Sequence, residues 1–211
     1  MAEMEEYRGQ KIVVRNGNRC IHSRYCVLER PDVFRPNVDG PWIDPDAAAP
    51  ETVAAQVAMC PSGALQYERV DGGPQEQPPG VNTVRVWENG PLAFHAELDI
   101  KGDTSSFRAT LCRCGQSKNK PYCDHSHVEA GFTATGEPPS KTLETLAVAN
   151  GKIKVTPQKN GSLMIEGALE VCAASGRTIS RAEKTWLCRC GHSNTKPFCD
   201  GTHKKVGFTA G

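Results

Sequence analysis

Three cysteines and one histidine recur at one spacing in two separate stretches of the chain. The first set is Cys112, Cys114, Cys123 and His127, and the second is Cys188, Cys190, Cys199 and His203. Both sets follow the pattern C-x-C-x8-C-x3-H, and both begin with Leu-Cys-Arg-Cys-Gly. Thiolates and imidazoles are soft metal ligands, and four of them so close together are typical of a metal site. Two matching sets therefore predict two metal sites.

A further group of cysteines lies nearer the N-terminus and has another pattern. Cys20 and Cys26 flank Ser23 in one loop, and Cys60 follows later in a Cys-Pro pair. The remaining cysteine, Cys172, has no counterpart in the first repeat, and we interpret it as a small core thiol.

Composition limits the class of protein. The chain has 211 residues, with 25 basic and 24 acidic side chains and a formal net charge of +1. So balanced a charge gives no broad field to attract nucleic acid or a membrane surface. The N-terminus is polar and acidic, and no apolar run is long enough to span a bilayer, so we expect a cytoplasmic protein. In that reducing compartment, ten cysteines favour metal ligation over disulfides.

The two four-ligand sets each lie in a longer repeat. Short alternating strands at 84–86 and 153–155 lead to the turns Asn89-Gly90 and Asn160-Gly161, and return strands follow at 92–100 and 163–171. The two turns are closer together in the chain than the two metal motifs, so the second repeat carries five extra residues between 173 and 184. One such unit buries too little core to be stable alone. We therefore expect the copies to pair about a pseudo-twofold axis, giving a monomer with internal symmetry.

The rest of the chain divides into the other domains. Residues 10–15 and 64–67 are typical of strands, Trp42-Ile43 of a brief strand, and 50–59 of an amphipathic helix with Pro50 in its first turn. Residues 71–80 are rich in Pro and Gly and predict a solvated linker. We expect an α+β protein with a domain at 1–70, a linker at 71–80, a first repeat at 81–135 and a second at 136–211, of which 136–151 connect the repeats.

Both four-ligand motifs resemble the CDGSH iron-sulfur family. Its signature is C-x-C-x2-[ST]-x3-P-x-C-D-G-[SAT]-H, and the second motif matches every position, whereas the first has His125 in place of the glycine. The resemblance implies that each motif holds a 2Fe-2S cluster through its three cysteines and one histidine. We expect Asp124 and Asp200 either to cap the turn that carries the histidine or to form hydrogen bonds around the ligands. Since glycine often marks a positive φ, His125 is expected to affect this turn.

The segment 1–70 resembles a single-cluster bacterial ferredoxin. That family has a C-x2-C-x2-C loop and a distant Cys-Pro. Here Cys20, Cys26 and Cys60 match three of its four ligands, and Ser23 replaces the second cysteine of the loop. Three thiolates suit a 3Fe-4S cluster, as in the ferredoxins that serve bacterial monooxygenases. The segment is also similar to a divergent group of 4Fe-4S mono-cluster proteins. In that case the fourth ligand is Ser23, water or His22, although His22 by itself is more typical of a solvated loop histidine than of a ligand.

Zinc is the competing metal, since three cysteines and one histidine form a common structural zinc site. Paired cysteines of zinc sites are usually separated by two to four residues, whereas those of both motifs are separated by one. The spacing therefore favours iron-sulfur.

A histidine ligand is expected to make the clusters sensitive to acid. Because an imidazole protonates near pH 6.5, we expect the visible absorbance of the clusters to decay faster at about pH 5.5 than at pH 8. The substitution His203→Cys should slow that decay. Equal rates at the two pH values would contradict a histidine ligand.

These observations indicate an electron-transfer protein rather than an enzyme, because the sequence shows no nucleophile with a partnering base. The expected cofactors are two 2Fe-2S clusters and one 3Fe-4S or 4Fe-4S cluster, and the expected partners are redox proteins. The alternatives are a protein that donates clusters to apo-acceptors or senses redox state or pH, and a zinc-stabilised interaction module.

Overall fold

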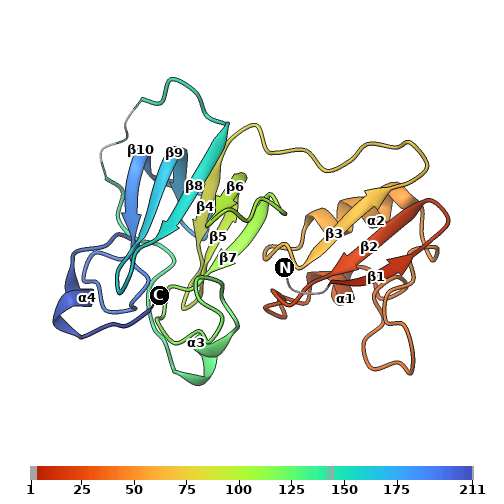
Figure 1. The fold of residues 1–211 in the computed structure, drawn as a ribbon, viewed down its shortest axis with the longest axis horizontal. Coiled ribbons are helices and arrows are strands. Elements are labelled where there is room, and N and C mark those ends of the chain that lie inside the picture. Colours follow the sequence, from red (N-terminus) through yellow and green to blue (C-terminus); the bar gives the residue numbers. More distant parts are fainter. Residues whose placement is uncertain (1–3, 142, 144, 211) are drawn as a thin grey trace. The chain divides into compact units, whose positions relative to one another are not determined.

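The computed structural model describes residues 4–141, 143 and 145–210. Residues 1–3 of the N-terminal segment, and 142 and 144 of the segment expected to connect the repeats, therefore lie outside it. The chain forms two compact units, Met1–Gln77 and Pro78–Gly211 (Figure 1). Among the described residues, no helix has the length and apolar character needed to cross a membrane.

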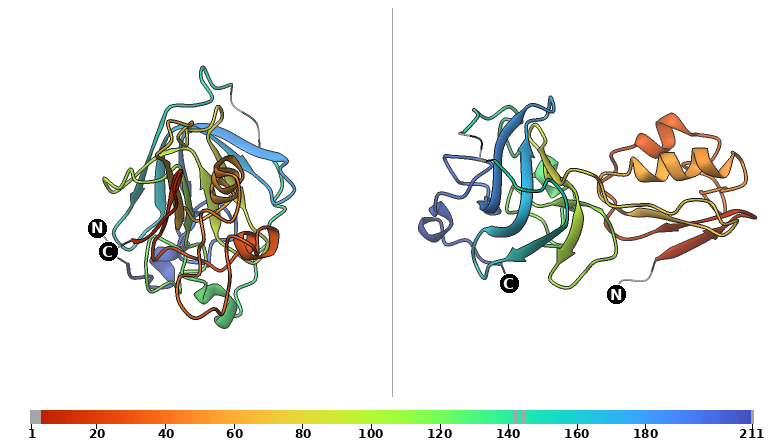
Figure 2. Two further views of the ribbon diagram at one scale, coloured as in Figure 1. Left: turned by 90° about the vertical axis from the view of Figure 1, so that its right-hand side faces the viewer. Right: turned by 90° about the horizontal axis from the view of Figure 1, so that it is seen from above.

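The first unit is a three-stranded antiparallel sheet with two helices on one face (Figure 2). Its strands are β1 (Glu5–Arg8), β2 (Ile12–Asn16) and β3 (Leu65–Arg69), in that order across the sheet. Helix α2 (Pro50–Ala58) packs on β3, and the short α1 (Tyr25–Glu29) packs on α2. Val53 and Val57 of α2 are fully buried in the core against Ile12 and Val14 of β2.

Two elements of this unit differ from the sequence prediction. Trp42-Ile43 is not a strand, because Ile43 makes only an isolated bridge with Phe34. Strand β1 was not predicted, since its residues are polar and mostly exposed. It pairs with β2 at the edge of the sheet, where no apolar alternation is required.

The second unit contains the two repeats and one seven-stranded sheet. The first repeat supplies β4 (Thr83–Val86), β5 (Leu92–His95), β6 (Glu97–Ile100) and β7 (Arg108–Leu111), followed by α3 (Ser126–Glu129). The second supplies β8 (Lys152–Pro157), β9 (Leu163–Cys172) and β10 (Thr178–Leu187), followed by α4 (Thr202–Lys205). The order is β6-β8-β9-β4-β5-β7, and β10 also pairs with β9. The first unit combines helices with an antiparallel sheet, and the second unit is mainly β, so the protein is α+β.

Strands of the two repeats pair with each other in a reciprocal way. Strand β4 runs parallel to the second half of β9, with Val84 opposite Val171. Strand β6 runs parallel to β8, with Ile100 opposite Val155. The two pairs are equivalent by the internal repeat. Moving the residue of the first repeat forward, and that of the second repeat back, by the spacing between the two Asn-Gly turns converts either pair into the other. Their buried side chains form one core, so neither repeat has a complete core without the other.

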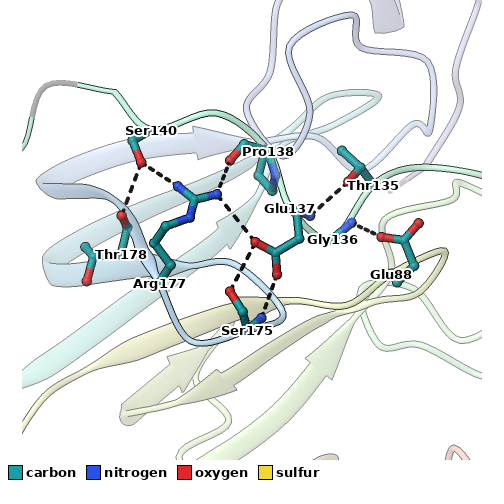
Figure 3. Close-up of polar contacts among 9 residues, drawn as sticks. All are labelled: Glu88, Thr135, Gly136, Glu137, Pro138, Ser140, Ser175, Arg177 and Thr178. Carbon is teal, nitrogen blue, oxygen red and sulfur yellow. Dashed lines mark hydrogen bonds and ion pairs between the residues drawn. The ribbon is translucent and has the colours of Figure 1, made fainter.

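The five-residue insertion of the second repeat holds the segment that joins the repeats (Figure 3). Glu137 accepts hydrogen bonds from the backbone and hydroxyl of Ser175 and pairs with Arg177, whose guanidinium also donates to Pro138 and Ser140. The backbone N–H of Ala174 donates to Gly136. The longer hairpin thus anchors the start of the connecting segment.

Candidate metal centres

Each C-x-C pair directly follows the last strand of its repeat. Strand β7 ends at Leu111 and β10 ends at Leu187, one residue before the first cysteine of each motif. The Sγ atoms of Cys112 and Cys114 are 3.7 Å apart, and those of Cys188 and Cys190 are also 3.7 Å apart. All four cysteines are buried.

The third cysteine and the histidine of each motif form a second pair. The Sγ atom of Cys123 is 3.5 Å from Nδ1 of His127, and that of Cys199 is 3.4 Å from Nδ1 of His203. The histidines lie in α3 and α4, which occupy the same end of the second unit (Figure 1). Each short helix thus turns an imidazole back toward the preceding cysteine.

These distances fit donors that share a metal. A tetrahedral metal with metal–sulfur bonds of about 2.3 Å and metal–nitrogen bonds of about 2.0 Å places two sulfurs about 3.8 Å apart, and sulfur and nitrogen about 3.5 Å apart. Each motif therefore presents two pairs with the separation expected of two ligands on one metal. Among the described residues, no three His, Cys, Asp or Glu side chains form a group that could hold one metal ion.

Neighbouring thiols and burial shift the pKa values of the cysteines in different directions. The hydrogen bond with Cys114 lowers the pKa of Cys112 to about 6, and the same contact raises the pKa of Cys114. Burial raises the pKa of Cys123 and of Cys190 to about 11. The pKa of His127 is lowered, first by burial and then by the nearby His125 and Arg113. Because ligation requires thiolate and neutral imidazole, metal binding must displace protons from the cysteines.

The N-terminal cysteines line one cavity of about 520 Å³ in the first unit. Cys20, Cys26 and Cys60 all contribute to its wall, as do His22 and Ser23. Burial raises the pKa of Cys20 and of Cys26, and the charge of Cys60 adds to both shifts, so the three thiols are electrostatic neighbours. Nδ1 of His22 is 3.9 Å from Sγ of Cys20. The structure thus brings together every residue that the sequence assigned to this site.

Comparison with protein families agrees with this arrangement of donors. The model described as iron-binding zinc finger CDGSH type matches residues 85–128 and 160–204, and the model described as divergent 4Fe-4S mono-cluster matches residues 7–70. The chain is a tandem CDGSH-type iron-sulfur protein with an N-terminal divergent single-cluster domain. The comparison with curated proteins returns no match.

The aspartates of the CDGSH motifs bind backbone rather than ligand side chains. Asp124 accepts hydrogen bonds from the N–H groups of Lys118 and Ser126, and Asp200 from those of Asn194 and Thr202. The residue at the N-cap position itself is His125 or Gly201, one place after the aspartate. The aspartates therefore fasten the ligand loop to the start of the helix that carries the histidine.

The CDGSH motifs also contain two arginines whose role the sequence did not reveal. Arginine side chains are mostly exposed in folded proteins, but Arg113 and Arg189 are 1% and 0% exposed. Arg113 donates hydrogen bonds to the carbonyls of Trp87, Gly90, Ala134 and Thr135. An arginine occupies the same position in both Leu-Cys-Arg-Cys-Gly segments, and this repetition was the feature of the sequence that could have indicated a structural role.

Arg189 repeats part of this network. It donates to the carbonyls of Gln158 and Gly161, and its Nη1 atom has no partner among the described residues. The position equivalent to Thr135 is residue 211, which lies outside the described part of the chain. Each arginine also stacks on a phenylalanine that follows its motif, Phe132 or Phe208. The arginines thereby tie the hairpin turn and the end of each repeat to the metal loop.

His125 adopts the backbone conformation of the glycine that it replaces. Its φ is +74°, compared with +84° for Gly201 in the second motif. The turn that the sequence put in question is therefore retained, at the cost of placing a side chain in the left-handed region. The ring of His125 lies edge-on to that of His127, with centroids 5.0 Å apart.

The substitution His125→Gly is expected to raise the free energy of unfolding by about 0.5 kcal/mol, because relief of about 1 kcal/mol of backbone strain exceeds the loss of an exposed ring contact worth about 0.5 kcal/mol. The matched substitution Gly201→His should lower it by about 1 kcal/mol. Denaturant unfolding of the holoprotein measures both. Stabilisation by Gly201→His would contradict the explanation.

Proposed function

We propose that this protein is an electron-transfer protein that carries three iron-sulfur clusters and has no enzymatic activity of its own. Two are 2Fe-2S clusters, one in each CDGSH repeat, held by the three cysteines and the histidine of the motif. The third lies in the cavity lined by Cys20, Cys26 and Cys60. Such clusters supply reversible single-electron chemistry at potentials that the ligands and their surroundings adjust.

The observation that carries this proposal is the pairing of donors within each CDGSH motif. A single zinc ion needs all four donors around one point, whereas the rhombus of a 2Fe-2S cluster needs two donors on each of two irons. The Cys112/Cys114 pair at 3.7 Å and the Cys123/His127 pair at 3.5 Å suit the second arrangement, because among the described residues no third donor joins either pair closely enough to share one metal ion. The corresponding separations in the second motif are 3.7 Å and 3.4 Å, so the same arrangement recurs there.

The reciprocal strand pairing supports an intramolecular pseudo-dimer as the assembly that carries the two clusters. The pairing of β4 with β9 is the counterpart, by the internal repeat, of the pairing of β6 with β8. A chain that already completes its core in this way has no need of a second copy, so we propose a monomer.

Metal analysis and electron paramagnetic resonance (EPR) test the proposal together. We expect about seven or eight irons per chain, with EPR signals of reduced 2Fe-2S centres after dithionite treatment. A colourless protein with two or three zinc ions would overturn it and favour a zinc-stabilised module.

For the N-terminal site we propose a 4Fe-4S cluster with His22 as its fourth ligand. The support is the place of the imidazole on the cavity wall, beside Cys20. Removal of His22 is then expected to release one iron, since a cubane that loses a ligand readily becomes a 3Fe-4S cluster.

The paired substitutions His22→Ala and Ser23→Ala measure this. We expect only His22→Ala to give the EPR signal of an oxidised 3Fe-4S cluster in the protein as isolated. The same signal from Ser23→Ala alone would assign the ligand to serine, and its presence in the unaltered protein would show a 3Fe-4S cluster from the start.

Cluster donation is a second candidate function, favoured by the unequal burial of the ligands. The C-x-C cysteines are buried, whereas His127 and His203 are partly exposed. An accessible imidazole is the ligand that solvent or an acceptor protein can displace first. Incubation of the holoprotein with an apo-ferredoxin separates the two functions: transfer of iron supports donation, and electron flow with intact clusters supports electron transfer.

A further inference from the structure

The two CDGSH motifs touch each other through their ligand turns. A Cβ atom added to Gly191 would lie 2.4 Å from the carbonyl oxygen of Cys114, and one added to Gly115 would lie 2.6 Å from that of Cys190. Each contact therefore joins a ligand of one motif to the residue directly after a ligand of the other. Although the motifs lie far apart in the sequence, their C-x-C-G turns are in backbone contact.

This contact lies in a buried and charged part of the second unit. Cys112, Cys114, Cys188 and Cys190 are at most 6% exposed, and Arg113 and Arg189 lie between the cysteines of each pair in sequence. The contact between the two motifs therefore lies in a part of the second unit from which solvent is largely excluded.

We propose that this contact couples the two cluster sites, so that the charge held at one site alters the reduction potential of the other. The inference rests on the proposed iron-sulfur function. An electron added at one site leaves an extra negative charge, and a second anionic site nearby then accepts an electron less readily. In a buried region this interaction is stronger than in water and is poorly screened by salt.

The substitution His203→Cys tests the coupling without touching the first site. It replaces a neutral ligand by a thiolate and so adds one negative charge at the second site. The holoprotein is titrated with dithionite, which supplies one electron to each 2Fe-2S site, and the two sites are followed separately by EPR, since an all-cysteine site has a different spectrum. We expect the midpoint potential of the first site, whose ligands are unchanged, to fall. The reciprocal substitution His127→Cys should lower the potential of the second site.

The control is Lys204→Glu, which changes the charge of an exposed side chain next to His203 and leaves the ligands intact. Its effect on the first site should disappear in 1 M salt, where the Debye length is about 3 Å, while that of His203→Cys should persist. If His203→Cys and His127→Cys each shift only their own site, the sites are independent and the inference is wrong. A protein that holds no iron would instead refute the proposed function.

Discussion

The substitution Gly191→Ala is expected to lower the free energy of unfolding by about 2–4 kcal/mol and to speed the loss of the cluster of the first repeat as well as that of its own repeat. The added methyl group would meet the carbonyl oxygen of Cys114 at 2.4 Å, well inside van der Waals contact. Overpacking of a buried contact costs about 1–3 kcal/mol. The φ of +85° at Gly191 adds about 1 kcal/mol of backbone strain.

The matched control for this prediction is Gly201→Ala. Gly201 has nearly the same φ, +84°, but an added Cβ would meet no atom within 4 Å. It should therefore show the backbone strain alone, about 1 kcal/mol. Denaturant unfolding measures the stability, and the rate of absorbance loss in the presence of a chelator measures cluster retention. Equal effects of the two substitutions would show that the contact between the motifs contributes nothing.

The second large effect is expected from Arg113→Met. Methionine fills much of the same volume but leaves the carbonyls of Trp87, Gly90, Ala134 and Thr135 without their donor. Hydrogen bonds to a charged group contribute about 1.5–3 kcal/mol each, and part of this is regained because a buried charge is removed, so we expect a loss of about 3–5 kcal/mol.

Two related substitutions make this prediction specific. Arg189→Met should cost less, because Arg189 donates to only two carbonyls among the described residues. Arg113→Lys keeps the charge but lacks the planar set of donors, so its loss of stability should lie between that of Arg113→Met and zero. Thermal unfolding of the three variants gives the ranking. A loss below about 1 kcal/mol for Arg113→Met would refute the structural role of this arginine.

Much of the candidate site was predictable because metal ligands are chosen by chemical type and local spacing. The C-x-C-x8-C-x3-H pattern alone located both sets of donors, and their pair distances of 3.4–3.7 Å agree with shared metals. Most of the hairpin strands were also predictable, since alternation and the Asn-Gly turns are local signals. The predicted return strand 92–100 instead divides into β5, which pairs with β4, and β6, which pairs with β8. Trp42-Ile43 failed as a strand because two residues can form a bridge without a neighbouring strand to extend it.

The sequence by itself determined that the chain carries two motifs of three cysteines and one histidine with the same spacing, and a further group of three cysteines, because these depend on residue type and short-range spacing. Only the tertiary structure decided how the motifs meet. The pairing of β4 with β9 and of β6 with β8, the burial of Arg113 and Arg189, and the contact of Gly191 with Cys114 all join residues far apart in the chain. Such contacts depend on how whole strands pack around one shared core, and no local pattern encodes that packing.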